Sequence, residues 1–408
     1  MAKKTIYYIF LLCVFFTIQS CSKTETSQDK IRIAIVAGTE GDAIKTIYKN
    51  YSKRIEIIEL SYTALREQLQ SSLSTNATNF DIVMIDDPWF PQLADYIAPL
   101  EPVPATLIDD IIPASLNLCK NPYGTGELKA LPFVGNTQLL FSRSDRLREA
   151  GLNTPPQTWS ELIRFASKLT TPENGKFGYA IRGRSGAPIV TDFLPIYWSL
   201  GGKLTHNSKG SLVESVDLET FISALEIYKQ LCRLSPPGSI NFDWTEMTAA
   251  FIHGTSAMEL NWPAAISDIE KALPNDSNGS RWIISLPPGL KTTGTSMIGD
   301  WLLAIPISST KKQEAKDLIL WLMDQQKAVA NTGRPPTRKS VYNELALKSP
   351  YFKVIEEALE SSTYRDRTKK WSLIEDAVSR SVSSYISDDA TAEATAKKLK
   401  KDIGIILQ

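Results

Sequence analysis

Apolar runs separated by amphipathic stretches recur over residues 31–100 of the chain. Residues 31–36 read "IRIAIV" and residues 54–62 read "RIEIIELSY", and both patterns predict β-strands. In residues 80–91, "FDIVMIDDPWFP", apolar side chains follow one another without polar alternation, as in a strand that is covered on both faces. A helix is expected around residues 65–73. The order of strands and helices predicts a doubly wound α/β domain with right-handed crossovers.

The later part of the chain alternates in the same way but contains more helix. Residues 131–151 begin extended and apolar and then pass into a helix. Thr158 and Glu161 form a T-x-x-E capping box, so the next helix is expected to begin directly after Thr158. Helical patterns also cover residues 217–234 and 311–330. The 408 residues are enough for two domains, at about 150 residues per domain.

The first 21 residues have the layout of a signal peptide. A basic "MAKK" precedes the apolar stretch "TIYYIFLLCVFFTI", and "QSC" follows. The end resembles a bacterial lipobox, which predicts cleavage before Cys21 and lipid modification of that residue. Residues 22–30 are polar and predict a flexible tether. We therefore expect an extracytoplasmic protein anchored to a bacterial membrane, at the cell surface or in the periplasm, with a plain secretory signal or an uncleaved anchor as the alternative.

Composition excludes several classes of function. The formal net charge is +0 and charged residues make up 22%, so nucleic acid is not an expected partner. The chain has 2 His, which argues against His-rich metal sites, and we predict neither a metal nor a cofactor. The motifs G-x-S-x-G, H-E-x-x-H, C-x-x-C and the P-loop are all missing from the sequence, so no enzyme activity is expected.

Two carboxylates and an aromatic residue follow the third predicted strand. Asp86, Asp87 and Trp89 come directly after the apolar run. In open α/β sheets ligands bind just outside the carboxyl ends of the strands, which favours a binding site here. The alternative is a turn or a helix N-cap, because Asp and Pro are common in both.

Five ordered segments resemble the extracellular solute-binding proteins of carbohydrate ABC importers. They are "FDIVMIDDPWFPQLADYIAPLEP", "LPFVGNTQLLFSRSDRLREAGLNTPPQTWSEL", "GTSAMELNWP", "GDWLLAIPISSTKKQEA" and "NTGRPPTRKS". The resemblance covers nearly all of residues 31–345 and implies a two-lobed periplasmic-binding-protein-like fold, each lobe a doubly wound sheet with helices, built from discontinuous segments. It also implies a sugar enclosed between the lobes, with ABC permease subunits as partners of a monomeric binding protein.

The resemblance places the lobe boundaries at the predicted crossovers. The N-terminal lobe would hold residues 31–135 and 300–345, and the C-terminal lobe residues 136–299 and 346–408. Cys119 and Cys232 would then lie in different lobes, where a disulfide would oppose closure, so we expect two free thiols.

Sugar recognition selects the candidate residues. Hydroxyl groups pair with carboxylates, amides and Arg, and the C–H faces of sugar rings stack on aromatic planes. The predicted ligand-binding residues are Glu40, Asp86, Asp87, Trp89, Asn136, Trp198, Asp243, Trp262, Gly299, Asp300, Trp301 and Arg334. At residues 299–301 the chain has Gly-Asp-Trp where the family often has Gly-Gly-Trp, so the Asp side chain adds either a polar contact or a turn.

Most of these residues also have a purely structural explanation. Glu40 lies in a loop where an exposed charge is common, and Asn136 stands beside a glycine in what is also a good turn. Trp198, Trp262 and Trp301 stand apart from helical periodicity, but a buried Trp is as often core as platform. The enzyme alternative is a surface glycoside hydrolase, with Asp87 paired with Glu40 or Asp300 as acid and base. A non-transport sugar sensor and a structural lipoprotein are further alternatives.

Overall fold

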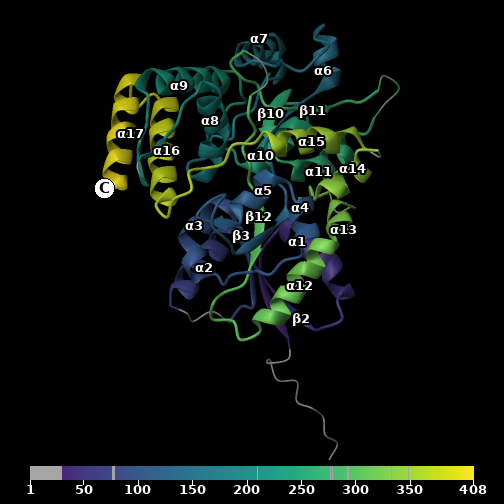
Figure 1. Cartoon of the computed structure of the whole chain (residues 1–408). Coiled ribbons are helices and arrows are strands. Elements are labelled where there is room, and N and C mark those ends of the chain that lie inside the picture. The colour runs from purple at the N-terminus through teal and green to yellow at the C-terminus, as the bar shows by residue number, and fades with distance from the viewer. Residues whose placement is uncertain are drawn as a thin grey trace, which may run out of the picture.

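The computed structural model describes residues 30–75, 79–208, 210–275, 277, 279–291, 294–331, 333–347 and 349–408. The predicted signal peptide with Cys21, and the predicted tether except its last residue, lie outside the described residues. Two bodies, here called the first and the second lobe, lie one above the other (Figure 1). Each lobe is built around its own β-sheet.

The first lobe contains a five-stranded sheet in the order β2-β1-β3-β12-β6. Its strands are β1 (Ile31–Val36), β2 (Ile55–Leu60), β3 (Ile82–Asp86), β6 (Ala130–Val134) and β12 (Trp301–Ala304). Strand β1 pairs in parallel with β2 and β3, as the alternation of strands and helices predicts. Strand β12 is antiparallel to both β3 and β6 and returns from the last third of the chain. The first lobe is therefore made of discontinuous segments.

Helices cover both faces of this sheet. They are α1 (Thr39–Ile47), α2 (Tyr62–Ser74), α3 (Phe90–Leu93), α4 (Ala105–Asp110), α5 (Pro113–Leu118), α12 (Lys312–Asp324), α13 (Gln326–Asn331) and α14 (Lys339–Leu345), with the 3₁₀ turns η2 (Tyr48–Asn50), η3 (Asp87–Trp89) and η4 (Ala94–Tyr96) and the hairpin β4 (Lys120–Asn121) and β5 (Glu127–Leu128). Helix α2 begins three residues earlier than its apolar pattern suggests, because the Ser61 hydroxyl caps it by accepting from the Ala64 amide at 3.3 Å.

The sheet of the second lobe corrects the expectation of a doubly wound sheet in each lobe. It has three strands in the order β10-β7-β11: β7 (Leu139–Ser142), β10 (Met258–Asn261) and β11 (Ile283–Ser285). Both outer strands run antiparallel to β7. Because Leu139 pairs with Asn261, the start of β7 and the end of β10 lie at the same edge of the sheet. The helices before β10 and β11 predicted parallel strands, but both strands pair with β7 in the antiparallel direction.

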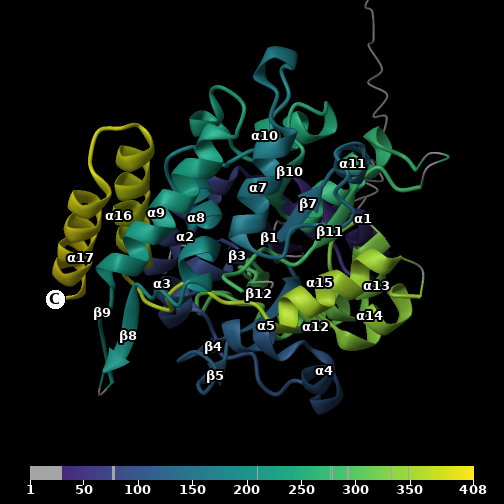
Figure 2. The same ribbon diagram turned by 90° about the horizontal axis from the view of Figure 1, so that it is seen from above.

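The helices of the second lobe include those that the sequence predicts within residues 131–151, after Thr158 and over residues 217–234. The second-lobe helices are α6 (Ser144–Glu149), α7 (Trp159–Leu169), α8 (Ala187–Ser199), α9 (Leu218–Arg233), α10 (Trp244–Ile252), α11 (Ile266–Ala272), α16 (Trp371–Ile386) and α17 (Ala392–Leu407), with η5 (Pro172–Asn174), η6 (Ser239–Asn241), η7 (Pro263–Ala265) and the hairpin β8 (Thr205–Ser208) and β9 (Ser211–Glu214). Helices α16 and α17 stand together at one side of this body in both views (Figures 1 and 2).

The capping box at the start of α7 is confirmed in its main part. Helix α7 begins at Trp159, and the Thr158 hydroxyl accepts from the Glu161 amide at 3.2 Å. The Glu161 carboxylate, however, accepts from the amide of Gln157 at 2.9 Å rather than from that of Thr158. The Glu161 side chain therefore holds Gln157, the residue before the N-cap Thr158.

Three crossings of the chain between the lobes lie side by side. Thr137 forms a bridge with Ile298, and Met297 forms a bridge with Thr363. The Ile298 amide donates to the Thr363 carbonyl at 3.0 Å. The third crossing, residues 361–370, connects α15 (Pro350–Glu360) to α16. The buried side chains of α15 belong to the same apolar core as those of α5 and α12 in the first lobe, whereas those of α16 belong to the second-lobe core. These crossings form a narrow hydrogen-bonded strip, on which any motion between the lobes depends.

The two described cysteines lie in different apolar cores. Cys119 is fully buried in the first-lobe core, and Cys232 is half-buried at the edge of the second-lobe core. Both are free thiols in the structure.

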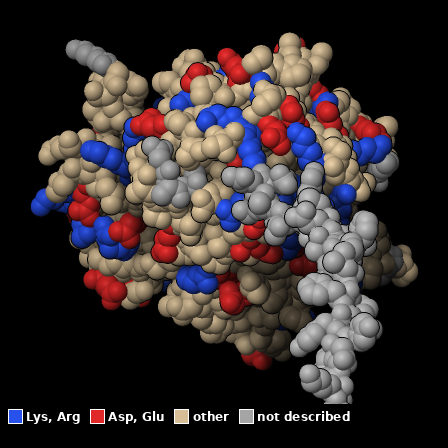
Figure 3. Space-filling view, turned by 90° about the horizontal axis from the view of Figure 1, so that it is seen from below, with Lys and Arg blue, Asp and Glu red and all other residues tan. Residues whose placement is uncertain are grey.

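The surface shows mixed charge. On the underside of the first lobe, acidic and basic side chains are interspersed and neither sign dominates (Figure 3). Within the described residues, no helix combines the length and the apolar character needed to cross a bilayer.

Candidate functional site

The end of β3 is the centre of the site. Asp86, its last residue, is 6% exposed and accepts a hydrogen bond from the Tyr62 hydroxyl at 2.7 Å. The Arg365 guanidinium lies 3.6 Å from the other carboxylate oxygen. Burial raises the pKa of Asp86 to about 7, although Arg365 opposes the shift. Asp86 is thus almost fully excluded from solvent, and its carboxyl group is partly protonated near neutral pH.

Asp87 is committed to ion pairs. Its side chain is 0% exposed and lies 2.9 Å from the Arg365 guanidinium and 3.1 Å from that of Arg367. Arg367 also donates to the Asp87 carbonyl at 2.7 Å, and the Asp87 amide donates to the Asp300 carbonyl at 3.0 Å. The two adjacent carboxylates therefore have different environments: the first contacts a phenol, and the second is enclosed by two guanidinium groups.

Three aromatic side chains border Asp86, and we call Tyr62, Trp89 and Trp301 the aromatic set. The Tyr62 ring lies 4.8 Å from Trp89 and 6.1 Å from Trp301, centroid to centroid. Trp89 and Trp301 meet edge to face at 5.8 Å. Both Trp side chains are buried, whereas the Tyr62 ring is 37% exposed. The aromatic set is a continuous apolar surface of which Tyr62 is the accessible part.

Trp262 of the second lobe contacts the second crossing segment at Gly299. A Cβ atom on Gly299 would lie 2.8 Å from the Trp262 ring and 3.6 Å from Arg365. Any side chain at position 299 would therefore have to displace an aromatic ring. Gly299 allows the half-buried Trp262 ring to pack against the backbone close to Arg365. Trp262, one of the residues predicted from the sequence, is therefore part of the candidate site.

A second group of predicted residues meets at the end of β1. The Asn136 side-chain amide donates to the Glu40 carboxylate at 3.2 Å. The Arg334 guanidinium donates to the Thr39 carbonyl at 2.6 Å. Burial lowers the pKa of Arg334, and Glu40 opposes this shift most strongly. The Asn136 carbonyl accepts from the Gly299 amide at 2.8 Å, which links this group to the crossing strip.

Arg182 extends the site into the second lobe. Its guanidinium donates to Asp243 at 2.7 Å, and its amide donates to Asp192 at 2.9 Å. Burial lowers the pKa of Arg182, while the nearby Tyr62 opposes the shift and Arg365 adds to it. Burial also raises the pKa of Asp192 to about 6. The ion pair with Asp243 holds the Arg182 guanidinium at the start of α10.

Asp243 has a local role as well. It caps α10 in a capping box with Glu246, and its carboxylate accepts from the Trp244 amide at 2.7 Å. Arg184 adds a second ion pair to the same carboxylate. Asp243 therefore holds the two arginines at the start of α10, and its own oxygens are already used.

Asp300 is the most enclosed of the predicted polar residues. Its side chain is 0% exposed, and neither carboxylate oxygen has a hydrogen-bond partner of good geometry among the described residues. Burial raises its pKa well above the usual range, and Ser115 and the backbone of Asn136 oppose the shift only in part. Burial therefore favours the neutral acid form of Asp300 over the anion.

Trp198 is not brought to these residues. It lies in the last turn of α8, whereas Arg182 and Gly186 precede the other end of that helix. Twelve residues of helix separate Trp198 from Gly186, which corresponds to about 18 Å along the axis. The Trp198 ring packs half-buried against the second-lobe core.

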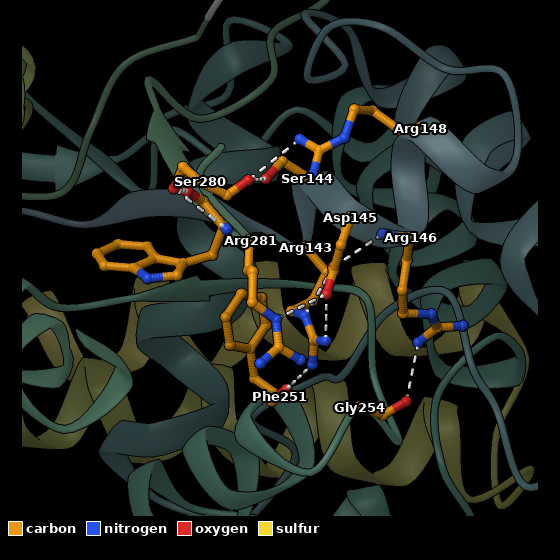
Figure 4. A network of polar contacts seen from close by, with 10 residues as sticks. Arg143, Ser144, Asp145, Arg146, Arg148, Phe251, Gly254, Ser280 and Arg281 are labelled. Carbon is orange, nitrogen blue, oxygen red and sulfur yellow. Dashed lines mark hydrogen bonds and ion pairs between the residues drawn. The ribbon is translucent and has the colours of Figure 1, made fainter. Parts of the chain in front are cut away.

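A separate polar network follows β7 and holds the top of the second lobe together (Figure 4). The Arg143 guanidinium contacts Asp145 at 2.6 Å and donates to the Phe251 carbonyl at 3.1 Å. Arg146 donates to the carbonyls of Gly254 at 3.1 Å and Leu169 at 2.9 Å. These arginines bond to the chain itself, so the network fixes loops and is not a binding site.

A surface pocket of about 600 Å³ lies elsewhere on the first lobe. It is lined by Glu101, Pro102, Val103, Ile108, Leu116, Lys120 and Leu128. None of the predicted ligand-binding residues lines it, and its lining is largely aliphatic. The aromatic set with its carboxylate and guanidinium partners remains the better candidate site, because it combines the groups that a polyhydroxylated ligand requires.

Sequence reasoning missed Tyr62, Arg182 and Arg365. Tyr62 follows the carboxyl end of β2, so the rule that selected Asp86 also selects it. Arg365 lies in the third crossing, which has no strand or helix pattern. Only the pairing of that crossing with the end of β3 assigns it to the site.

Fold and site together define a two-lobed binding protein with a polar and aromatic site where the lobes meet. The chain belongs to the bacterial extracellular solute-binding protein family, whose model matches residues 35–328. This family consists of extracytoplasmic solute-binding proteins and not of enzymes. Asp87, the acid or base of the hydrolase alternative, is enclosed by Arg365 and Arg367, which agrees with the family.

Individual relatives share about a quarter of their aligned residues with this chain. The chain is 26% identical over 349 residues to a probable amino-acid ABC transporter periplasmic-binding protein of Sinorhizobium fredii, covering 81% of this chain and 76% of the relative. It is 27% identical over 326 residues to the mannitol-binding protein of Pseudomonas aeruginosa, covering 74% and 71%. The structure matches that of maltose-bound MalE3 of T. maritima with a TM-score of 0.81 and 24% identity, covering 93% and 100%. The structural match shows the two-lobed fold.

The buried acid Asp300 leads to a prediction on pH and stability. Its pKa is raised in the folded state above the ordinary 3.8, so between these two values the folded chain holds a proton that the unfolded chain lacks. Stability contributed by this proton is lost as the pH rises. We expect Asp300→Asn to stabilise the protein more at pH 8 than at pH 5, by up to about 1.4 kcal/mol per pH unit.

Urea unfolding of both proteins at the two pH values measures this difference. Asp109→Asn is the control, because it makes the same substitution at an exposed position of the first lobe. An equal effect of Asp300→Asn at both pH values would show that Asp300 is ionised in the folded state.

Proposed function

We propose that this protein captures a sugar or polyol between its two lobes and delivers it to an ABC importer, as a monomer anchored to the membrane through a lipid on Cys21. The observation that carries the proposal is the aromatic set beside Asp86 and Arg365, at the carboxyl ends of the first-lobe strands. Aromatic faces accept the C–H surface of a sugar, and the charged groups pair with its hydroxyls.

Charge balance at the site favours an uncharged ligand. The four arginines of the site, Arg182, Arg184, Arg365 and Arg367, face four carboxyl groups, those of Asp86, Asp87, Asp192 and Asp243. An ionic ligand would have to replace one of these partners or remain unpaired in a buried position, which is costly. A polyol can both donate and accept hydrogen bonds without changing the charge.

The relatives support the same class of ligand. One is named a mannitol-binding protein, and a structural neighbour was solved with bound maltose. Another relative is named a probable amino-acid transporter protein, so amino acids are the class against which the proposal has to be tested. A thermal-shift screen with mannitol, ribitol, maltose and the amino acids distinguishes the two. A ligand at 100 times its dissociation constant should stabilise the protein by about 2.7 kcal/mol.

The accessible aromatic residue gives the first prediction from this proposal. Tyr62→Ala removes the exposed part of the aromatic set and the hydrogen bond to Asp86, so we expect affinity for the ligand found in the screen to fall by about 1–3 kcal/mol. Calorimetric titration measures the loss. Tyr51→Ala is the control, since Tyr51 contacts Trp321 at 5.0 Å and lies outside the site. Equal affinities of both variants and the wild type would exclude the aromatic set as the binding surface.

We expect Asp86 to bind the ligand and Asp87 to support the fold. Asp86→Ala is expected to weaken ligand binding by about 1–3 kcal/mol, because it removes a buried hydrogen-bonding carboxyl group from the centre of the site. Asp87→Ala leaves Arg365 and Arg367 without a carboxylate partner and is expected to destabilise the fold by about 3–5 kcal/mol. Titration and urea unfolding of both variants test this. The assignment is wrong if Asp86→Ala loses only stability or if Asp87→Ala unfolds at the wild-type urea concentration.

The membrane anchor is tested on the full chain. Cys21→Ala removes the proposed acceptor of the lipid, so the variant should pass from the detergent-rich to the aqueous phase in a partition experiment. Mass spectrometry of the wild type should find an acylated Cys21 at its N-terminus. An aqueous wild type with an unmodified Cys21 would indicate a plain secretory signal instead.

A further inference from the structure

We propose that Arg66 and Glu375 form a clasp between the lobes, which holds them together before any ligand binds. Arg66 lies on α2 in the first lobe, and Glu375 lies on the first turns of α16, whose apolar face belongs to the second-lobe core. The Arg66 guanidinium lies 3.8 Å from the Glu375 carboxylate. The pair therefore joins helices that belong to different lobes.

Both partners of the clasp are held by their own lobe. The Arg66 guanidinium lies 6.0 Å from the centroid of the Trp89 ring, within reach of a cation–π interaction. On the other side, the Trp371 indole N–H donates to the Glu375 carboxylate at 3.3 Å. Each charge thus needs little reorganisation to meet the other, which lowers the entropic cost that makes most exposed ion pairs weak.

Burial distinguishes this pair from a neighbouring contact between Lys369 and Asp95. The side chains of Lys369 and Asp95 are 60% and 53% exposed, whereas those of Arg66 and Glu375 are 25% and 9% exposed. Water screens the first pair and screens the second much less. Burial raises the pKa of Glu375, and Arg365 and Arg66 oppose this shift by favouring the charged carboxylate.

The position of the clasp connects it to the candidate site. Trp89 belongs to the aromatic set, so Arg66 contacts the site on one side and the second lobe on the other. Closed lobes that are favoured without ligand raise the population that is competent to bind, and apparent affinity rises in proportion. The inference rests on the proposed function only for this consequence; the clasp itself concerns the ligand-free protein.

Small-angle scattering of the ligand-free protein tests the clasp. Arg66→Met and Glu375→Gln should each shift the balance between open and closed lobes about two- to tenfold toward the open state, seen as a larger radius of gyration. The double variant should match either single variant, because the two residues act through one contact. Arg66→Lys keeps the charge and should retain a radius close to that of the wild type.

Lys45→Met is the matched control. Lys45 pairs with Glu59 at 2.9 Å within the first lobe, so its loss removes an ion pair without touching the lobe contact. The proposal is overturned if the radius is the same in all variants, or if the two single effects add in the double variant. A lower melting temperature with an unchanged radius would also overturn it, since that result describes a structural pair. Because no ligand is present, failure here leaves sugar capture standing, and a failed ligand screen leaves the clasp standing.

Discussion

The buried ion cluster around Asp87 is the constraint on which the rest of the site depends. A carboxylate that is 0% exposed is stable only when its charge is matched, and Arg365 and Arg367 match it from the third crossing. Arg367 also donates to the Leu118 carbonyl at 2.9 Å, next to α5. The crossing is therefore attached to the first lobe at several points, and the start of α16 is placed with it.

From this attachment follows the division of roles at the end of β3. The Arg365 Nη2 atom that contacts Asp87 at 2.9 Å also faces Asp86, at the longer distance of 3.6 Å, and the other partner of Asp86 is the Tyr62 hydroxyl. Asp86 gains less compensation than Asp87, and its pKa is raised to about 7 by burial. A residue that is only partly satisfied by the protein can still make strong hydrogen bonds to a ligand, whereas a fully satisfied one supports its neighbours.

The two lobes bring loop residues to the hydrogen-bonded strip of crossings by different strand pairings. In the first lobe, parallel strands end at the same edge, and β12 enters from the opposite direction next to them. In the second lobe, antiparallel pairing returns β10 to the edge from which β7 departs, so Trp262 follows directly at the contact with Gly299. Both arrangements bring loop residues to the strip, but only the first follows from the pattern of alternating strands and helices.

The sequence by itself determined the features that depend on neighbours along the chain. The strand ending at Asp86, the start of α7 and the crossings near Asn136 and Gly299 follow from apolar runs, caps and glycines, which act over a few residues. The ordered segments also identified the family and its two-lobed fold. The tertiary structure alone decided which polar residues meet, because Arg365 lies 278 positions from Asp87 and its segment has no local pattern. It also decided that Asp300 is buried, which favours its neutral form, while Tyr62 stays accessible, since burial is a property of packing between distant segments and not of residue type.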